Sequence, residues 1–194
     1  MESKSAETQR AFGFLFLCVA LAVGSAAIIS EVAHRGGAPF YFHAVIWISS
    51  FAVVFGTTVP KFRKIAPAIR GRMKASTKWP SASKALNAVC WAGPFLAIAA
   101  FPSLYQYLIL AGIGLGNLST YFLVKKYSGN DNREQLIVGS VALASLPLAL
   151  AVDTTIFSTD QGIAIMISRM LIALSYAAGG GYALTVGKLI NGSS

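Results

Sequence analysis

Charged residues, cysteine and histidine are all scarce in this sequence. Asp, Glu, Lys and Arg make up 12% of its 194 residues, whereas a typical soluble domain contains about 25%. The two cysteines, Cys18 and Cys90, fall inside apolar runs, which predicts neither a disulfide nor a thiolate metal site. The two histidines, His34 and His43, are the whole supply of imidazole. Bis-histidine ligation of a single haem is an alternative that would use both of them.

Recognisable catalytic motifs are absent as well. The sequence has no nucleotide-binding glycine loop, no Ser-His-Asp spacing and no set of cysteine ligands. We therefore expect no cofactor and no protein-bound metal. The absence of chemistry-bearing motifs favours a protein that is not an enzyme.

Long apolar runs are what the sequence has in abundance. Hydrophobic residues make up 55% of it, and six stretches are close to the roughly 20 residues that a helix needs to cross a bilayer. The apolar run after Arg10 is too long for a signal-peptide core, so we expect it to be the first span. Pro94 and Pro147 predict kinks in two of the spans. The expected fold class is all-α, a single-domain polytopic membrane helix bundle of six transmembrane helices. The predicted spans cover residues 11–33, 40–59, 84–101, 104–124, 136–152 and 162–187.

The distribution of positive charge predicts the topology. The net charge is +9, and fourteen of the sixteen Lys and Arg residues lie on one side of the predicted bundle. Residues 61–83 are the most basic loop, and Arg35 and Arg169 are the two bases on the other side. Because cytoplasmic loops carry an excess of Lys and Arg, we expect both termini and this loop to be cytoplasmic.

The basic cytoplasmic loop also carries apolar residues at helical spacing. Phe62, Ile65, Ile69 and Met73 are three, four and four residues apart, which predicts a short helix in the membrane interface with its bases on anionic head groups. The alternatives are a loop that serves only to set topology and a segment that docks to an acidic protein. We do not expect this loop to bind nucleic acid, because Trp79 is its one residue that could stack on a base. The residues predicted to contact lipid head groups are Lys61, Arg63, Lys64, Arg70, Arg72 and Lys74.

A second polar group is expected at the other face of the bundle. Arg169 is the one charge that lies away from the ends of a predicted span, and a lone charge at depth costs about 3 kcal/mol on insertion scales. We expect it to pair with Glu31 or Asp153. An ion pair of structural importance, a site for an anionic ligand or head group, and a divalent metal site are alternative interpretations. The predicted polar cluster consists of Glu31, His34, His43, Asp153, Asp160 and Arg169.

Small residues recur at helical spacing in the predicted spans. Lipid is as apolar as leucine, so membrane helices associate where small residues let their backbones approach. Gly179, Gly180 and Gly181 are also compatible with an unwound helix of the kind that forms transporter sites. The residues predicted to pack between helices are Ala20, Gly24, Ala27, Gly112, Gly116 and Gly180.

One short segment carries a resemblance to a known group. Ile28-Ile29-Ser30-Glu31 is followed by Gly36-Gly37-Ala38-Pro39 and then by an apolar span. This resembles the Ile-Ser-x-x-Gly…Pro segment of the Frag/DRAM-like group of six-helix membrane proteins. The resemblance implies a six-span bundle in a group with members linked to lipid handling or membrane trafficking. It implies no catalytic residues.

Three functions are therefore open. The first is a membrane component without catalysis, either an accessory or structural subunit of a membrane complex or a lipid-interacting protein. Its expected partners are membrane lipids, anionic on the cytoplasmic side, with other membrane proteins or a second copy of the chain. The second is a small transporter or channel, which fits the presence of Arg169, Asn117 and the glycine run. The third is a membrane enzyme that uses the outer Glu, His and Asp side chains.

Overall fold

The protein is an all-helical bundle, as the sequence predicts. A computed structural model describes residues 2–76 and 79–192, and describes side chains within 7–71, at 74 and within 79–186. No strand occurs in these residues. The helices are α1 (Glu2–Arg35), α2 (Tyr41–Ser76), α3 (Ser81–Ala100), the 3-10 turn η1 (Pro102–Leu104), α4 (Tyr105–Ser128), α5 (Arg133–Ala151), the π-helical turn η2 (Val152–Ile156) and α6 (Gln161–Gly192).

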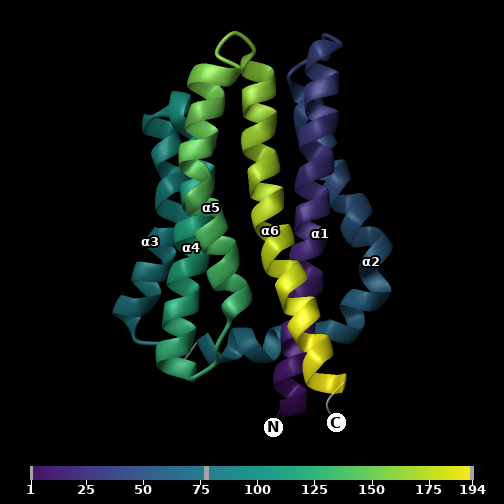
Figure 1. The fold of residues 1–194 in the computed structure, drawn as a ribbon, viewed down its shortest axis with the longest axis vertical. Helices are drawn as coiled ribbons and strands as arrows, with labels where there is room; N and C mark the ends of the chain where they lie inside the picture. Colours follow the sequence, from purple (N-terminus) through teal and green to yellow (C-terminus); the bar gives the residue numbers. More distant parts are fainter. Residues whose placement is uncertain (1, 77–78, 193–194) are drawn as a thin grey trace.

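The helices lie side by side in the order α2, α1, α6, α5, α4, α3 (Figure 1). The chain runs back and forth between two ends of this row. One end, here called the basic end because it carries most of the Lys and Arg residues, holds the start of α1 and the end of α6. It also holds the second half of α2 and the α4–α5 connection at residues 129–132 (Figure 1). The opposite end carries the connections at residues 36–40, 101–104 and 157–160. Six helices thus form three hairpins.

The surface of the bundle matches a hydrocarbon environment. Large apolar side chains are exposed along the outer helices, among them Ile48 and Leu96, which are 70% and 73% exposed. Five helical stretches in the described residues are long and apolar enough to cross a membrane: Glu7–Arg35, Tyr41–Gly71, Pro102–Ser128, Arg133–Ile156 and Gln161–Val186. This architecture is that of a multi-pass membrane protein.

Helix α3 is not among these five stretches, because Lys84 and Asn87 make its first half more polar. Helix α4 forms hydrogen bonds with Asn87 and Trp91 of α3. Asn87 Oδ1 accepts hydrogen bonds from the hydroxyls of Ser119 at 2.8 Å and Thr120 at 3.0 Å. The indole N–H of Trp91 donates to the hydroxyl of Thr120 at 3.0 Å. These bonds place Asn87 and the Trp91 indole N–H between α3 and α4.

Helix α2 differs from the sequence prediction. We expected a span ending at Val59 and then a separate basic loop, either plain or with a short interfacial helix, but a single helix continues through Pro60 and Pro67. Proline removes one helix hydrogen bond and bends the axis. Thr57 and Thr58 donate to carbonyls one turn back, at 2.8 and 2.7 Å, which adds to the bend. The second half of α2 therefore turns aside and runs across the basic end of the bundle (Figure 1).

Glycines bring neighbouring backbones close together. A Cβ added at Gly13 of α1 would lie 3.0 Å from the Gly180 carbonyl oxygen, and one at Gly180 would lie 2.9 Å from that of Gly13. In α4, the contacts are with aromatic rings of α3. A Cβ added at Gly112 would lie 2.7 Å from the ring of Phe95, and one added at Gly116 would meet the ring of Trp91. In lipid there is no hydrophobic driving force between helices, so close packing at small residues holds them together instead.

The remaining predicted packing residues also lie between helices. A Cβ added at Gly24 would meet Ala173 of α6 at 3.6 Å, and Ala20 and Ala27 are 8% and 0% exposed. Helix α6 stays helical through residues 179–181. Gly179 and Gly180 pack against neighbouring helices, and the run is not the unwound segment that was the alternative interpretation.

Candidate functional site

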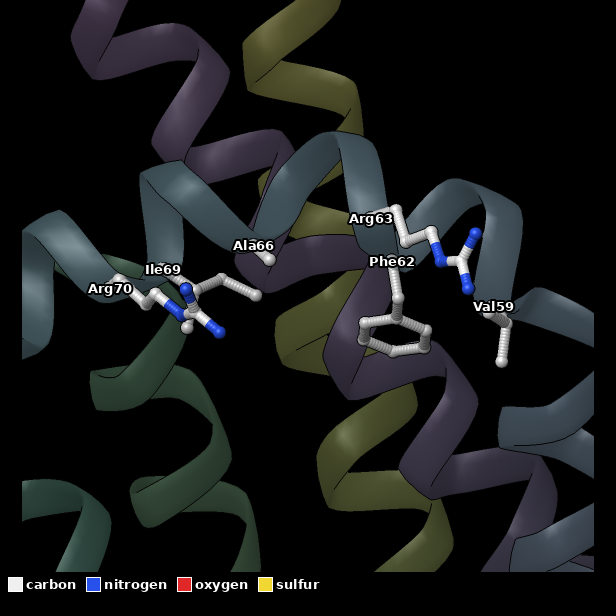
Figure 2. Close-up of a pocket in the computed structure, with 6 residues that line it drawn as sticks. All are labelled: Val59, Phe62, Arg63, Ala66, Ile69 and Arg70. Carbon is white, nitrogen blue, oxygen red and sulfur yellow. The ribbon is translucent and has the colours of Figure 1, made fainter.

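The basic second half of α2 forms a groove. Val59, Phe62, Ala66 and Ile69 recur every three or four residues and line an apolar space of about 300 Å³. Arg63 and Arg70 line the same groove. Figure 2 shows both guanidinium groups on the side of the helix that carries the Phe62 ring. The groove therefore combines an apolar floor with two positive charges.

Aromatic packing fixes this segment against the bundle. The ring of Phe62 lies 5.1 Å from that of Phe55 and 5.5 Å from that of Phe14 in α1. Lys61 lies over the Phe14 ring at 5.6 Å, a distance at which a cation is attracted to the ring face. Ile69 packs against the main hydrophobic core. The segment is thus held by side chains on its apolar side.

The other bases predicted to contact lipid lie along the same segment. Lys61, Arg63, Lys64, Arg70 and Lys74 are all exposed. The side chains of Arg72 and Met73 lie outside the described residues. Ile65 is half-buried and does not line the groove. The structure thus brings Arg63 and Arg70 together with apolar residues and leaves the other described bases around them.

At the opposite end, Arg35 joins two of the predicted carboxylates. Its guanidinium lies 2.7 Å from Glu31 Oε1 and 2.5 Å from Asp160 Oδ2. Asp160 Oδ1 also accepts the backbone N–H of Ile163 at 3.2 Å, and so caps the start of α6. Arg35, and after it this N–H, hold the pKa of Asp160 below its ordinary value of 3.8. The ion pairs tie α1 to the start of α6.

The Arg35–Asp160 ion pair predicts a pH-dependent contribution to stability. Because the folded-state pKa of Asp160 is lowered, this contribution is complete above the ordinary pKa and is lost as the pH falls through the folded-state value. Asn keeps a capping side chain but no charge. We expect Asp160→Asn to lower the melting temperature slightly at neutral pH, and this effect should fade as the pH falls below the ordinary pKa. In an Arg35→Gln background the same change should have a smaller effect at neutral pH, because only the hydrogen bond from the Ile163 N–H remains, and an undiminished effect there would contradict the ion pair.

Arg169 and Asp153 do not form the ion pair that we expected. Arg169 lies over the Trp47 ring of α2 at 5.5 Å, and its charge acts on the hydroxyl of Tyr105. Asp153 Oδ2 accepts hydrogen bonds from Gln106 Nε2 at 2.9 Å and from the Tyr107 hydroxyl. Within the described residues, no carboxylate comes within ion-pair distance of Arg169.

Competition among neighbours explains why this prediction was wrong. Glu31 is one helical turn from Arg35 and pairs with it first. Asp153 lies in η2 and is engaged by the start of α4. The aromatic and amide partners Trp47, Tyr105, Gln106 and Tyr107 were not anticipated. The only sequence signal for three of them was a polar Tyr-Gln-Tyr run at the start of a predicted span.

The histidines lie near this end but apart from the ion pairs. The rings of His34 and His43 have centroids 6.1 Å apart, with His34 exposed and His43 half-buried. In the part of the chain that the structure describes, no three His, Cys, Asp or Glu residues converge as metal ligands would. The six residues of the predicted polar cluster thus divide into an Arg35-centred group, a histidine pair, and the separate Arg169 and Asp153.

Comparison with known proteins adds no assignment. No protein-family model, curated protein or solved structure matches this chain.

Proposed function

We propose that this protein is a six-span membrane protein without catalytic activity, which binds anionic phospholipid on its cytoplasmic face. The observation that carries the proposal is the groove on the second half of α2. An amphipathic helix at the interface buries its apolar side among acyl chains and holds its bases at the head groups. A groove lined by Phe62 and Ile69, with Arg63 and Arg70 beside them, offers one lipid both kinds of contact.

Charge supports the choice of an anionic lipid. Each Lys or Arg near an anionic membrane surface contributes about 1 kcal/mol to the attraction. Residues 61–84 contain eight Lys or Arg residues and no acidic residue. The cytoplasmic leaflet is the one that carries anionic lipids, and it is the side that the positive-inside rule assigns to this segment.

Six spans require that α3 also crosses the membrane. Its hydrogen bonds to α4 through Asn87 and Trp91 support this, because they remove polar groups from the lipid-facing surface. A role as an accessory or structural subunit fits a bundle whose outer helices expose apolar faces. The resemblance to the Frag/DRAM-like group agrees with a role in lipid handling.

A small transporter is the second candidate function. Arg169 favours it, because a charge inside a span without a carboxylate partner marks substrate pathways in many membrane proteins. The continuous helix of α6 through residues 179–181 speaks against the broken-helix kind of transporter site. Transport of an anion by the purified protein in liposomes would favour this alternative.

Removal of two charges from the groove tests the proposal. We expect Arg63→Gln with Arg70→Gln to weaken the binding of acyl-labelled phosphatidylglycerol to the purified protein by about thirtyfold, the effect of about 2 kcal/mol. Binding is measured by fluorescence titration in a neutral detergent.

A charge-matched pair at the same end provides the control. Lys125→Gln with Lys126→Gln removes the same charge from two exposed residues outside the groove. This pair should weaken binding by threefold or less, in keeping with screened attraction at a distance. Equal losses in the two double variants would contradict a lipid site at the groove and leave only general charge attraction.

A further inference from the structure

The two histidines of the chain lie side by side at the opposite end of the bundle. His34 is in the last turn of α1, and His43 is in the first turn of α2. The centroids of their rings are 6.1 Å apart, and the ring planes are inclined to each other by 47°. We expected no protein-bound metal from the sequence, in which the two residues are far from the close spacing of a ligand motif. The turn between α1 and α2 is what brings them together.

Backbone hydrogen bonds fix both histidines in this turn. The Gly37 N–H donates to the His34 carbonyl at 3.0 Å. Gly37 has a φ of 74°, the left-handed conformation in which glycine commonly ends a helix. At the start of α2, the His43 N–H donates to the Phe40 carbonyl at 3.1 Å. The two imidazoles are therefore held near each other before any ligand binds, which lowers the entropy cost of binding.

Both imidazoles are accessible from outside the bundle. His34 is exposed and His43 is half-buried. Within the described part of the chain, no hydrogen bond or ion pair engages either ring, and the ring of His43 has one further aromatic neighbour, Phe40, at 6.1 Å. The ring nitrogens are therefore available to a ligand that approaches from the aqueous side.

The distance between the rings suits a shared transition-metal ion. Imidazole is a preferred ligand of Zn²⁺, Cu²⁺ and Ni²⁺, whereas Mg²⁺ and Ca²⁺ prefer oxygen ligands. A metal ion binds an imidazole nitrogen at about 2.0–2.1 Å. An ion bonded to one nitrogen of each ring holds the ring centroids at a separation close to the observed one. Rotation of the two side chains is enough to complete such a pair, and the backbone need not move.

The surrounding charges favour a cation at this end. Glu31 lies one helical turn before His34 and therefore on the same side of α1. Glu31 and Asp160 together carry one more charge than Arg35, which joins them. Fourteen of the sixteen Lys and Arg residues lie on the other side of the bundle. A divalent cation therefore meets less repulsion at the histidines than it would at the basic end.

We propose that His34 and His43 bind one transition-metal ion of the class of Zn²⁺ or Cu²⁺. The ion joins the end of α1 to the start of α2, and water completes its coordination. The site lies at the end of the bundle opposite the lipid groove and does not depend on it.

Titration with Zn²⁺ tests the proposal. The protein is purified without a polyhistidine tag, in neutral detergent, and binding is measured by isothermal titration calorimetry. We expect one Zn²⁺ per chain. His34→Gln and His43→Gln should each weaken binding by about tenfold or more, because even the loss of an outer-shell partner of a metal ligand has an effect of that size.

Thermal melting gives a second measurement on the same variants. Zn²⁺ should raise the melting temperature of wild type, because it binds the folded turn and not the unfolded chain. It should raise that of neither histidine variant. Without Zn²⁺, both variants should melt with wild type, since neither ring is buried.

Matched controls separate this site from other ligands and from the groove. Cys18→Ala with Cys90→Ala removes both thiols of the chain and should keep the Zn²⁺ affinity. Arg63→Gln with Arg70→Gln should also keep it, so failure of the groove proposal and failure of this inference are distinguishable. Pulsed electron paramagnetic resonance of the Cu²⁺-loaded protein should detect two bound imidazoles in wild type and one in each histidine variant.

Three results would overturn the proposal. Wild type that binds no Zn²⁺, or binds it no more tightly than both histidine variants, would leave the two rings as a packing contact. Half a Zn²⁺ per chain together with a dimer would place the metal between two copies. Competition by Mg²⁺ or Ca²⁺ at the same concentrations as Zn²⁺ would assign the ion to carboxylate ligands.

Discussion

Gly180→Ala is expected to destabilise the bundle, whereas the same change at the next residue is not. The added Cβ at Gly180 would lie 2.9 Å from the carbonyl oxygen of Gly13 and about as close to the side chain of Leu17. Because the nearest atom belongs to the α1 backbone, two whole helices must move apart. Overpacking of this kind costs about 1–3 kcal/mol. We expect a clear fall in melting temperature for the purified protein in detergent.

Gly181→Ala is the matched control for this prediction. No atom lies within 4 Å of a Cβ added at Gly181. Alanine is about 1 kcal/mol more favourable than glycine inside a helix, so this variant should be as stable as wild type or slightly more stable. If both variants melted at the same temperature, the close contact of α1 and α6 would be wrong.

Accessibility of single cysteines should show an all-or-none difference between the two ends. In a background with Cys18→Ala and Cys90→Ala, we expect Ser158→Cys to react with an impermeant thiol reagent in intact cells and Ser81→Cys to resist it. Both serines are exposed at connections between helices, at the opposite end and the basic end respectively. The positive-inside rule is the physical reason, because fourteen Lys and Arg residues lie on one side and two on the other.

Permeabilised cells provide the control for this experiment. Ser81→Cys should react as soon as the membrane is opened to the reagent, which shows that the thiol itself is accessible. Labelling of Ser81→Cys in intact cells, with protection of Ser158→Cys, would reverse the orientation. The lipid site on α2 would then face the wrong leaflet for anionic lipid.

The number of helices, and the ends of α3 to α6, were largely predictable from the sequence. Span lengths and loop charges predicted six helical segments, and the structure has helices at each of them. The structure confirms the all-helical class. It also puts Gly112 and Gly116 against Phe95 and Trp91, a contact that the spacing of the glycines suggested without naming the partners.

The path of α2 was not predictable from local rules. Proline usually ends or bends a helix, so we expected the span to end before Pro60 and any helix in the basic loop to be a separate, short one. The helix persists because Phe62 packs between Phe55 and Phe14, and Ile69 packs on the core. These contacts come from helices that the sequence does not show to be neighbours. The groove therefore becomes visible only when α2 lies across the bundle.

The partners of Arg169 and Asp153 were not predictable from the sequence either. Arg169 drew attention as a lone charge in an apolar span, but nothing in the sequence ranked its possible partners. The carboxylates at Glu31 and Asp153 were plausible because opposite charges attract at any separation in the chain. In the folded protein, Arg35 takes Glu31, and Gln106 with Tyr107 takes Asp153.

The sequence by itself determined that the chain is a membrane-compatible helical bundle. Apolar run length and charge bias are local quantities, and a bilayer selects them segment by segment without reference to other helices. Only the tertiary structure decided which helices are neighbours, where α2 bends, and which polar groups meet. Those choices depend on the side-chain shapes of several helices at once, because in lipid helices are held by close packing and hydrogen bonds between particular residues.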